Sequence, residues 1–139
     1  MTDRNFKILR VFMLLNDIFF ILYWSVTVMH LIPEEFLYKD YNNPILVTWN
    51  WSFFALDMFI SLTGITSIIL NKLKIEIWKQ LTVISLTLTF CSGLQAISFW
   101  AIQQDFDLVW WIPNLFLLVY PIVFMFKYFS NERVKAGKV

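Results

Sequence analysis

The stretch from residue 48 to residue 70, TWNWSFFALDMFISLTGITSIIL, decides the fold of this chain. It carries a single charged residue, Asp57. It is long enough to cross a hydrocarbon core of roughly 30 Å, which takes about 20 apolar residues in a helix. Because lipid cannot hydrogen-bond to a bare backbone, such a segment forms an α-helix. The sequence therefore predicts a transmembrane helix with one carboxyl group at membrane depth.

Three further stretches, near residues 8–31, 78–101 and 108–129, meet the same criterion. The composition agrees, with 59% hydrophobic and 15% charged residues, against roughly 45–50% and about 25% in soluble domains. The first stretch follows basic residues as a signal peptide does, but Asn16-Asp17 interrupts it, so we expect it to be retained. We predict an all-α, four-transmembrane-helix bundle that forms one integral membrane domain over residues 1–139, multi-pass in a bacterial cell membrane.

Charge and tryptophan distributions predict the orientation of this bundle. Ten of the eleven lysines and arginines lie near the termini or around the connection between the second and third stretches, and Lys39 is the exception. Basic residues stay on the cytoplasmic side, so we expect both termini to be cytoplasmic. The outer half would then hold an aromatic belt. It comprises Trp24, Trp49, Trp51, Trp100, Trp110 and Trp111.

The connection over residues 32–47 is the one sizeable segment outside the expected spans, and Pro33 and Pro44 bracket it. It is too apolar for a free linker, so we expect it to lie over the outer end of the bundle as a lid. Its apolar residues are Phe36, Leu37, Tyr38 and Tyr41.

Several kinds of chemistry are excluded by residue counts. The one cysteine, Cys91, cannot form an internal disulfide or a thiol pair, and the one histidine, His30, cannot supply bis-histidine haem ligation. We expect no metal and no cofactor. No basic tract with interleaved aromatic residues is present, so we expect no nucleic acid partner.

Polar residues recur at helical spacing in every stretch and predict one shared interior, because steps of seven residues return to the same helix face. We call these polar faces seams. In chain order, one for each stretch, they are Asn16, Tyr23 and His30; Asn50, Asp57, Gly64 and Asn71; Thr82, Ser85, Thr89 and Ser92, with Gln95 at the edge; and Asn114, Pro121 and Tyr128. Such residues commonly hold membrane helices together. This packing role does not explain Asp57, because Ser or Asn would form hydrogen bonds between helices without a charge to bury.

We therefore expect Asp57 to border an outer-half cavity and to bond a polar side chain of another helix, with Tyr23, Thr27, Gln95 and Asn114 as candidate partners. His30 would approach Asn50. Because the outer half of the spans holds no lysine or arginine, the acid is either protonated or paired with an added cation. The predicted ligand-binding residues are Asp57, His30, Asn50, Tyr23, Gln95, Asn114, Trp51 and Trp111. Asp17 is open between a structural role, paired with a rim residue such as Arg10, and a functional one.

Two resemblances follow from longer motifs. Residues 29–36 (MHLIPEEF), 43–46 (NPIL) and 51–57 (WSFFALD) resemble the EXPERA group, which includes emopamil-binding sterol isomerases and sigma-type receptors. The resemblance implies four helices around a pocket open to lipid, with Asp57 as the second-helix acid, His30 ending the first helix and Asn114 beside Pro113 in the fourth. Since a second acid to complete an acid/base pair with His30 is lacking, we expect binding rather than isomerisation.

The chain also resembles the YvaD-like family of small membrane proteins from Gram-positive bacteria. The motifs are residues 49–53 (WNWSF), 89–96 (TFCSGLQA) and 110–114 (WWIPN). This resemblance covers nearly the whole chain and implies no particular activity.

Three functions remain open at this point. The first is a pocket for a hydrophobic or amphiphilic molecule, cationic or sterol-like, entering from membrane lipid. The second is a non-catalytic accessory or structural subunit, whose seams merely hold helices. The third is a small multidrug-type, proton-coupled exporter, which the long outer connection and the strong charge bias disfavour. A homodimer is compatible with the sequence.

Overall fold

The computed structural model describes the backbone of residues 3–136 and the side chains of residues 6–130. The described chain forms four long helices, α1 (Asp3–Val28), α2 (Pro44–Lys72), α3 (Trp78–Ile102) and α4 (Leu108–Ala136), and a 3-10 helix η1 (Glu34–Phe36). All four long helices are long and apolar enough to cross a membrane. The prediction of an all-α bundle of four transmembrane helices is therefore confirmed.

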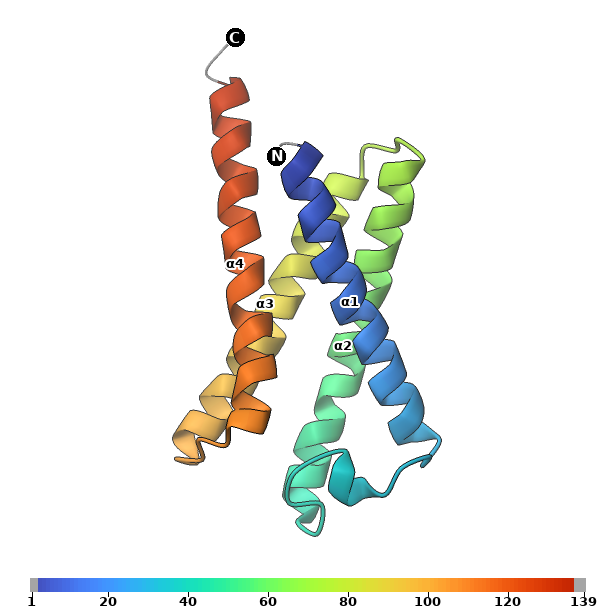
Figure 1. Ribbon diagram of the computed structural model, residues 1–139, viewed down its shortest axis with the longest axis vertical. Helices are drawn as coiled ribbons and strands as arrows, with labels where there is room; N and C mark the ends of the chain where they lie inside the picture. The colour runs from blue at the N-terminus through green and yellow to red at the C-terminus, as the bar shows by residue number, and fades with distance from the viewer. Residues whose placement is uncertain (1–2, 137–139) are drawn as a thin grey trace.

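Helices that are consecutive in the chain pack side by side, α1 on α2, α2 on α3 and α3 on α4. The α1–α2 pair and the α3–α4 pair spread apart toward the end that holds η1 and the α3–α4 connection (Figure 1). We call this the acidic end, because Asp105 and Asp107 lie there. The start of α1, the α2–α3 connection and the end of α4 lie at the opposite end (Figure 1), which we call the basic end because Lys72, Lys74 and Lys79 lie around the α2–α3 connection.

Three helices end on a residue in the left-handed conformation, and in none of them is it glycine. His30 (φ 49°), Lys74 (φ 60°) and Gln104 (φ 57°) follow α1, α2 and α3. After α1, the Leu31 amide donates to the Val26 carbonyl at 3.1 Å, the bond of a Schellman motif. The first helix therefore ends at Val28, three residues before the predicted boundary.

The start of α2 was also placed too late by the sequence. The Asn43 side chain accepts a hydrogen bond from the Ile45 amide at 3.0 Å, and Pro44 occupies the first turn. An asparagine cap followed by proline is a favourable helix start, because proline has no amide to leave unpaired. Helix α2 thus begins at Pro44 rather than at Thr48.

Both glycines inside the helices allow close helix contact. A Cβ on Gly93 would lie 2.6 Å from the Leu118 amide nitrogen and 2.8 Å from the Asn114 carbonyl oxygen, so α3 touches the backbone of α4 there. A Cβ on Gly64 would overlap the carboxyl group of Asp17 in α1. Small residues at helix crossings have this role in membrane proteins.

The hydroxyl face of α3 packs against α2. Thr82, Ser85, Thr89 and Ser92 are all buried. The hydroxyl groups of Thr82 and Ser67 lie 2.9 Å apart across the interface. Gln95, expected at the edge of this face, is exposed instead.

A candidate binding cavity at the acidic end

Asp57 lies in the interior of the bundle, with 4% of its surface exposed. Its Oδ2 accepts a hydrogen bond from Trp24 Nε1 of α1 at 2.9 Å, and its Oδ1 accepts one from Ser92 Oγ of α3 at 3.3 Å. Both donors are neutral. Within the described residues, Asp57 has no basic partner.

The carboxyl group of Asp57 borders a cavity of about 430 Å³. This volume is within the range of about 300–1,000 Å³ typical of small-molecule sites. All four helices and the first connection line it. Its walls are rich in aromatic side chains, namely Phe19, Phe20, Tyr23, Trp24, Phe36, Tyr38, Trp49, Phe53, Trp100 and Trp110.

The cavity opens sideways between α1 and α4. Phe19 of α1 and Val109 of α4 line it, yet they are 61% and 73% exposed on the bundle surface. Closer to the basic end, Phe12 of α1 stacks on Phe116 and Tyr120 of α4, with ring centroids 5.6 and 5.9 Å apart, and closes the gap. The cavity thus reaches the bundle surface in the acidic half, beside membrane-spanning helices.

The first connection covers the acidic end of the cavity, as expected for a lid. Leu37 and Tyr38 are buried, and the Tyr23 hydroxyl of α1 donates to the Leu37 carbonyl at 3.1 Å. The expectation was wrong for Phe36 and Tyr41, which are 73% and 40% exposed. Two side chains pointing inward are enough to anchor a segment this short.

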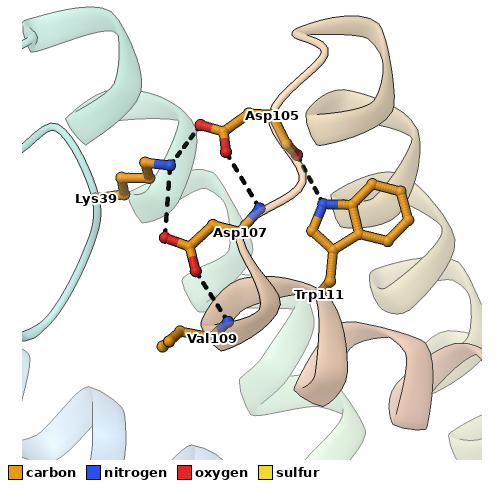
Figure 2. A network of polar contacts seen from close by, with 5 residues as sticks. All are labelled: Lys39, Asp105, Asp107, Val109 and Trp111. Atoms are coloured by element: carbon orange, nitrogen blue, oxygen red, sulfur yellow. Dashed lines mark hydrogen bonds and ion pairs between the residues drawn. The ribbon is translucent and has the colours of Figure 1, made fainter.

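Lys39 ties this lid to the α3–α4 connection (Figure 2). Its Nζ lies 2.5 Å from Asp105 Oδ2 and 3.7 Å from Asp107 Oδ2. It also lies 5.6 Å from the ring centroid of Trp100, a cation–π distance. The hydrogen bond with Asp105 raises the pKa of Lys39 above its usual value and lowers that of Asp105 below its own. The ion pair therefore joins the lid to the α3–α4 connection across the acidic end, where the two helix pairs spread apart.

The two carboxylates are themselves held by backbone amides (Figure 2). Asp105 accepts from the Asp107 amide at 3.3 Å, and Asp107 accepts from the Val109 amide at 3.0 Å at the start of α4. The Trp111 indole donates to the Asp105 carbonyl at 2.7 Å. The connection thus presents both acids to Lys39 in a fixed position.

Half of the eight predicted ligand-binding residues line the cavity: Asp57, Tyr23, Asn50 and Asn114. The Tyr23 hydroxyl and the Asn50 side chain bond each other at 3.2–3.3 Å, and Asn114 donates to the Trp110 carbonyl at 2.7 Å. None of the four expected side chains bonds Asp57: Tyr23 and Asn114 have the partners just named, Thr27 bonds the Tyr23 carbonyl, and Gln95 is exposed.

The other four predicted residues lie outside the cavity lining. His30 and Gln95 are exposed, and His30 does not reach Asn50 because the chain turns away at its left-handed backbone. Trp51 packs on Trp24 with ring centroids 5.4 Å apart, and Trp111 bonds the α3–α4 connection. Trp51 and Trp111 therefore pack behind residues that line the cavity and do not face the cavity themselves.

Trp24 and Lys39 were missed as site residues. Trp24 was assigned to the interfacial belt, but it is 2% exposed and donates to Asp57. A signal was present, because Trp24 follows Asp17 by seven residues and so shares its helix face. Lys39 gave no comparable signal, since no periodicity constrains a connection.

Asp17, the second carboxyl group at membrane depth, is separate from the cavity lining. It is 1% exposed, and it forms no ion pair with Arg10, contrary to one expectation. The Ser61 hydroxyl lies between the two acids, 3.2 Å from the Asp17 carbonyl oxygen and 3.0 Å from that of Asp57.

These features define a multi-pass, four-helix membrane protein with a cavity that is bordered by the carboxyl group of Asp57 and reaches the side of the bundle. The chain belongs to the family of unknown function DUF5360, which it matches over residues 9–135. It is similar to the uncharacterized protein YvaD of Bacillus subtilis (strain 168), with 49% identity over 119 residues, 86% of this chain and 90% of that protein. The resemblance to the YvaD-like family is thereby confirmed. No solved structure matches the chain.

Proposed function

We propose that this protein binds an amphiphilic organic cation in the cavity above Asp57. The observation that carries the proposal is the position of that carboxyl group, buried at the cavity wall and bonded by two neutral donors. Burying a carboxylate away from water is unfavourable unless a cation compensates it. A ligand's ammonium group would supply that charge.

The shape of the cavity supports an elongated, largely apolar ligand. Trp49, Trp100 and Trp110 present aromatic surface on the side toward the acidic end. Aromatic faces attract organic cations as well as hydrocarbon. The lateral opening beside Phe19 suits a molecule that partitions into the bilayer before it binds, so membrane lipid is both solvent and competitor.

This proposal uses the resemblance to the EXPERA group for the arrangement of helices and pocket, and not for a reaction. Four helices around a laterally open pocket, with an acid in the second helix, are what that likeness implies. His30 is exposed, which leaves Asp57 without a histidine partner in the cavity. We therefore propose ligand binding and no isomerase reaction.

A binding measurement in nanodiscs tests the proposal. A dansyl-labelled alkyl quaternary ammonium would be excited by energy transfer from the cavity tryptophans, and a matched alcohol would serve as its uncharged analogue. Asp57→Asn should weaken binding of the ammonium probe at least about tenfold, or about 1.4 kcal/mol, and leave the alcohol unchanged. Asp40→Asn, the same change at an exposed position, is the control. Equal affinity of wild type and Asp57→Asn for the ammonium probe would refute the proposal.

A structural subunit is the second candidate, and the hydroxyl contacts between α2 and α3 favour it. Ser67 with Thr82, and Ser85 with the Ile60 carbonyl at 3.4 Å, join helices without facing the cavity. In that case neither probe would bind to the wild type or to Asp57→Asn, and a copurifying complex would stay assembled in the variant.

We further propose that the basic end faces the cytoplasm of a bacterial cell membrane. Lys72, Lys74 and Lys79 lie around the α2–α3 connection, and cytoplasmic loops are enriched in such residues. A cysteine added after Lys138, in a Cys91→Ser background, should react with a membrane-impermeant maleimide only in permeabilised cells. Labelling of intact cells would reverse the orientation.

A further inference from the structure

Asp17 is a buried acid whose carboxyl group has no charged partner and no well-formed hydrogen bond among the described residues. It is 1% exposed, and among the described residues neither of its carboxyl oxygens accepts or donates a hydrogen bond. The side chain of the adjacent Asn16, which is 5% exposed, is close enough to interact with this carboxyl group, but its nitrogen forms no well-aligned hydrogen bond. Unsatisfied buried polar groups are rare in folded proteins and call for an explanation.

The carboxyl group lies where α2 has no side chain. A Cβ on Gly64 would overlap Asp17 Oδ2 and would lie 3.0 Å from Ser85 Oγ of α3. Gly64 follows Asp57 by seven residues, so Asp17 lies about 10 Å closer to the basic end than the cavity floor. Asp17 and Gly64 are both absent from the lining of the cavity.

The groups around Asp17 are neutral on every helix that packs near it. α1 contributes Asn16, α2 contributes Ser61 and Gly64, and α3 contributes Ser85. From α4, Tyr120 is the titratable side chain close enough to interact with Asp17. None of these groups offsets the charge of a carboxylate.

We propose that Asp17 is a proton-binding site whose protonation is coupled to the cavity at Asp57. A proton adds to the carboxylate to give the neutral acid, and no other bond forms or breaks. The neutral acid fits the tight space against the Gly64 backbone, whereas a carboxylate there would require a donor or a cation that the packing does not supply. The coupling to ligand binding rests on the function proposed above, and the proton site itself does not.

The coupling has a structural route through the α1–α2 interface. Asp17 and Trp24 are seven residues apart on one face of α1, and Gly64 and Asp57 are seven apart on the facing side of α2. The contact of Asp17 with Gly64 and the hydrogen bond of Trp24 with Asp57 are therefore successive contacts of one interface. Loss of the proton from Asp17 would loosen the first contact and weaken the second. By linkage, a ligand at Asp57 would change proton affinity at Asp17 by the same factor.

Infrared spectroscopy of the protein in nanodiscs tests the proton site directly. Exposed aspartates are ionised at about pH 7, so a protonated carboxyl C=O band at that pH reports a buried neutral acid. The experiment uses the Asp57→Asn background, which removes the other membrane-depth acid and separates this test from that of the proposed function. Asp17→Asn should abolish the remaining band, and Asp40→Asn should leave it unchanged. A band that survives Asp17→Asn would overturn the proposal.

Two further measurements keep the test decisive. If Asp17→Asn does not fold, Gly64→Ala should shift or remove the band by displacing the carboxyl group, and an unchanged band would count against the site. Replacing choline chloride with sodium chloride should have no effect. Loss of the band on adding sodium would show a sodium site and overturn the assignment to a proton.

The coupling is measured with the dansyl quaternary ammonium, whose own charge does not change with pH. Wild-type affinity should fall severalfold as the pH rises through the titration of the infrared band. Asp17→Asn should lack this fall while still binding the probe. Parallel pH profiles of wild type and Asp17→Asn would overturn the coupling.

Discussion

The indole nitrogen of Trp24 in α1 lies 2.9 Å from Oδ2 of Asp57 in α2. This bond joins two helices at the floor of the cavity and orients the carboxyl group toward its interior. Trp24 is 2% exposed, so the indole is fully packed at this position. The bond therefore contributes both to helix packing and to the geometry of the site.

Trp24→Phe should lower stability by about 1 kcal/mol, since interhelical hydrogen bonds in membranes are worth about 0.6 kcal/mol on average, and the smaller ring also loses packing. It should also weaken the dansyl ammonium probe, because Asp57 is no longer held. Denaturation with sodium dodecyl sulfate in mixed micelles measures the first effect. Trp78→Phe, which alters a tryptophan packed against Phe6 at the basic end, is the control for the probe. Full probe affinity in Trp24→Phe would contradict the orienting role.

Lys39→Gln should open the lid, because it removes the charge that pairs with Asp105 and Asp107. Amide hydrogen exchange of residues 36–39 should become severalfold faster, with little change inside the four helices. Lys79→Gln removes a lysine that pairs with Glu76 at the basic end, and it should leave exchange in the lid unaltered. Identical exchange in Lys39→Gln and wild type would show that Leu37 and Tyr38 alone hold the segment.

The lid should also respond to acid. The pKa of Asp105 is lowered by the hydrogen bond from Lys39, so its contribution is complete above the usual value of 3.8 and is lost as the pH falls through the lower value. The pKa of Lys39 is raised, so its contribution is lost only as the pH rises beyond its usual 10.5. Lid exchange, corrected for intrinsic rates, should stay constant between these limits and accelerate below about pH 3.8. In Lys39→Gln the acid step should disappear.

Gly93→Ala should destabilise the bundle by about 1–3 kcal/mol, because the new methyl group would meet backbone atoms of α4 that cannot rotate away. Thermal denaturation in detergent micelles measures the change. Cys91→Ala, a similarly small change on the exposed side of the same helix, should be nearly neutral. A neutral Gly93→Ala would mean that α3 and α4 pack less closely than the structure indicates.

Lys74→Gly should stabilise the protein by about 0.5–1 kcal/mol, because glycine adopts a positive φ without the clash that other residues incur. Lys72→Gly removes the same charge from the last helical residue of α2 and should instead destabilise by about 1 kcal/mol. Comparing the two denaturation midpoints cancels the effect of lost charge. A destabilised Lys74→Gly would refute the strain argument.

The seven-residue spacing of polar residues gave correct predictions for properties that depend on a single helix. Asp57 faces the interior as expected, since a charged face avoids lipid. Its partners could not be predicted, because helical spacing does not fix how far one helix is shifted along its neighbour. Trp24 and Ser92, rather than Tyr23 or Asn114, lie at the depth of Asp57. His30 was misplaced because a left-handed turn ends α1 before it.

The sequence by itself determined that there are four membrane-spanning helices, which of their faces are polar and which end is basic. These properties follow from local hydropathy, period and charge, because every segment meets the same lipid solvent. Only the tertiary structure decided that Lys39 would pair with Asp105 across the acidic end, that Trp24 would bond Asp57, and that Asp17 would lie against Gly64 with no charged partner among the described residues. The contacts of Trp24 and Asp17 depend on the relative depth and rotation of two helices, and the contact of Lys39 depends on where packing of the helix pairs places two connections.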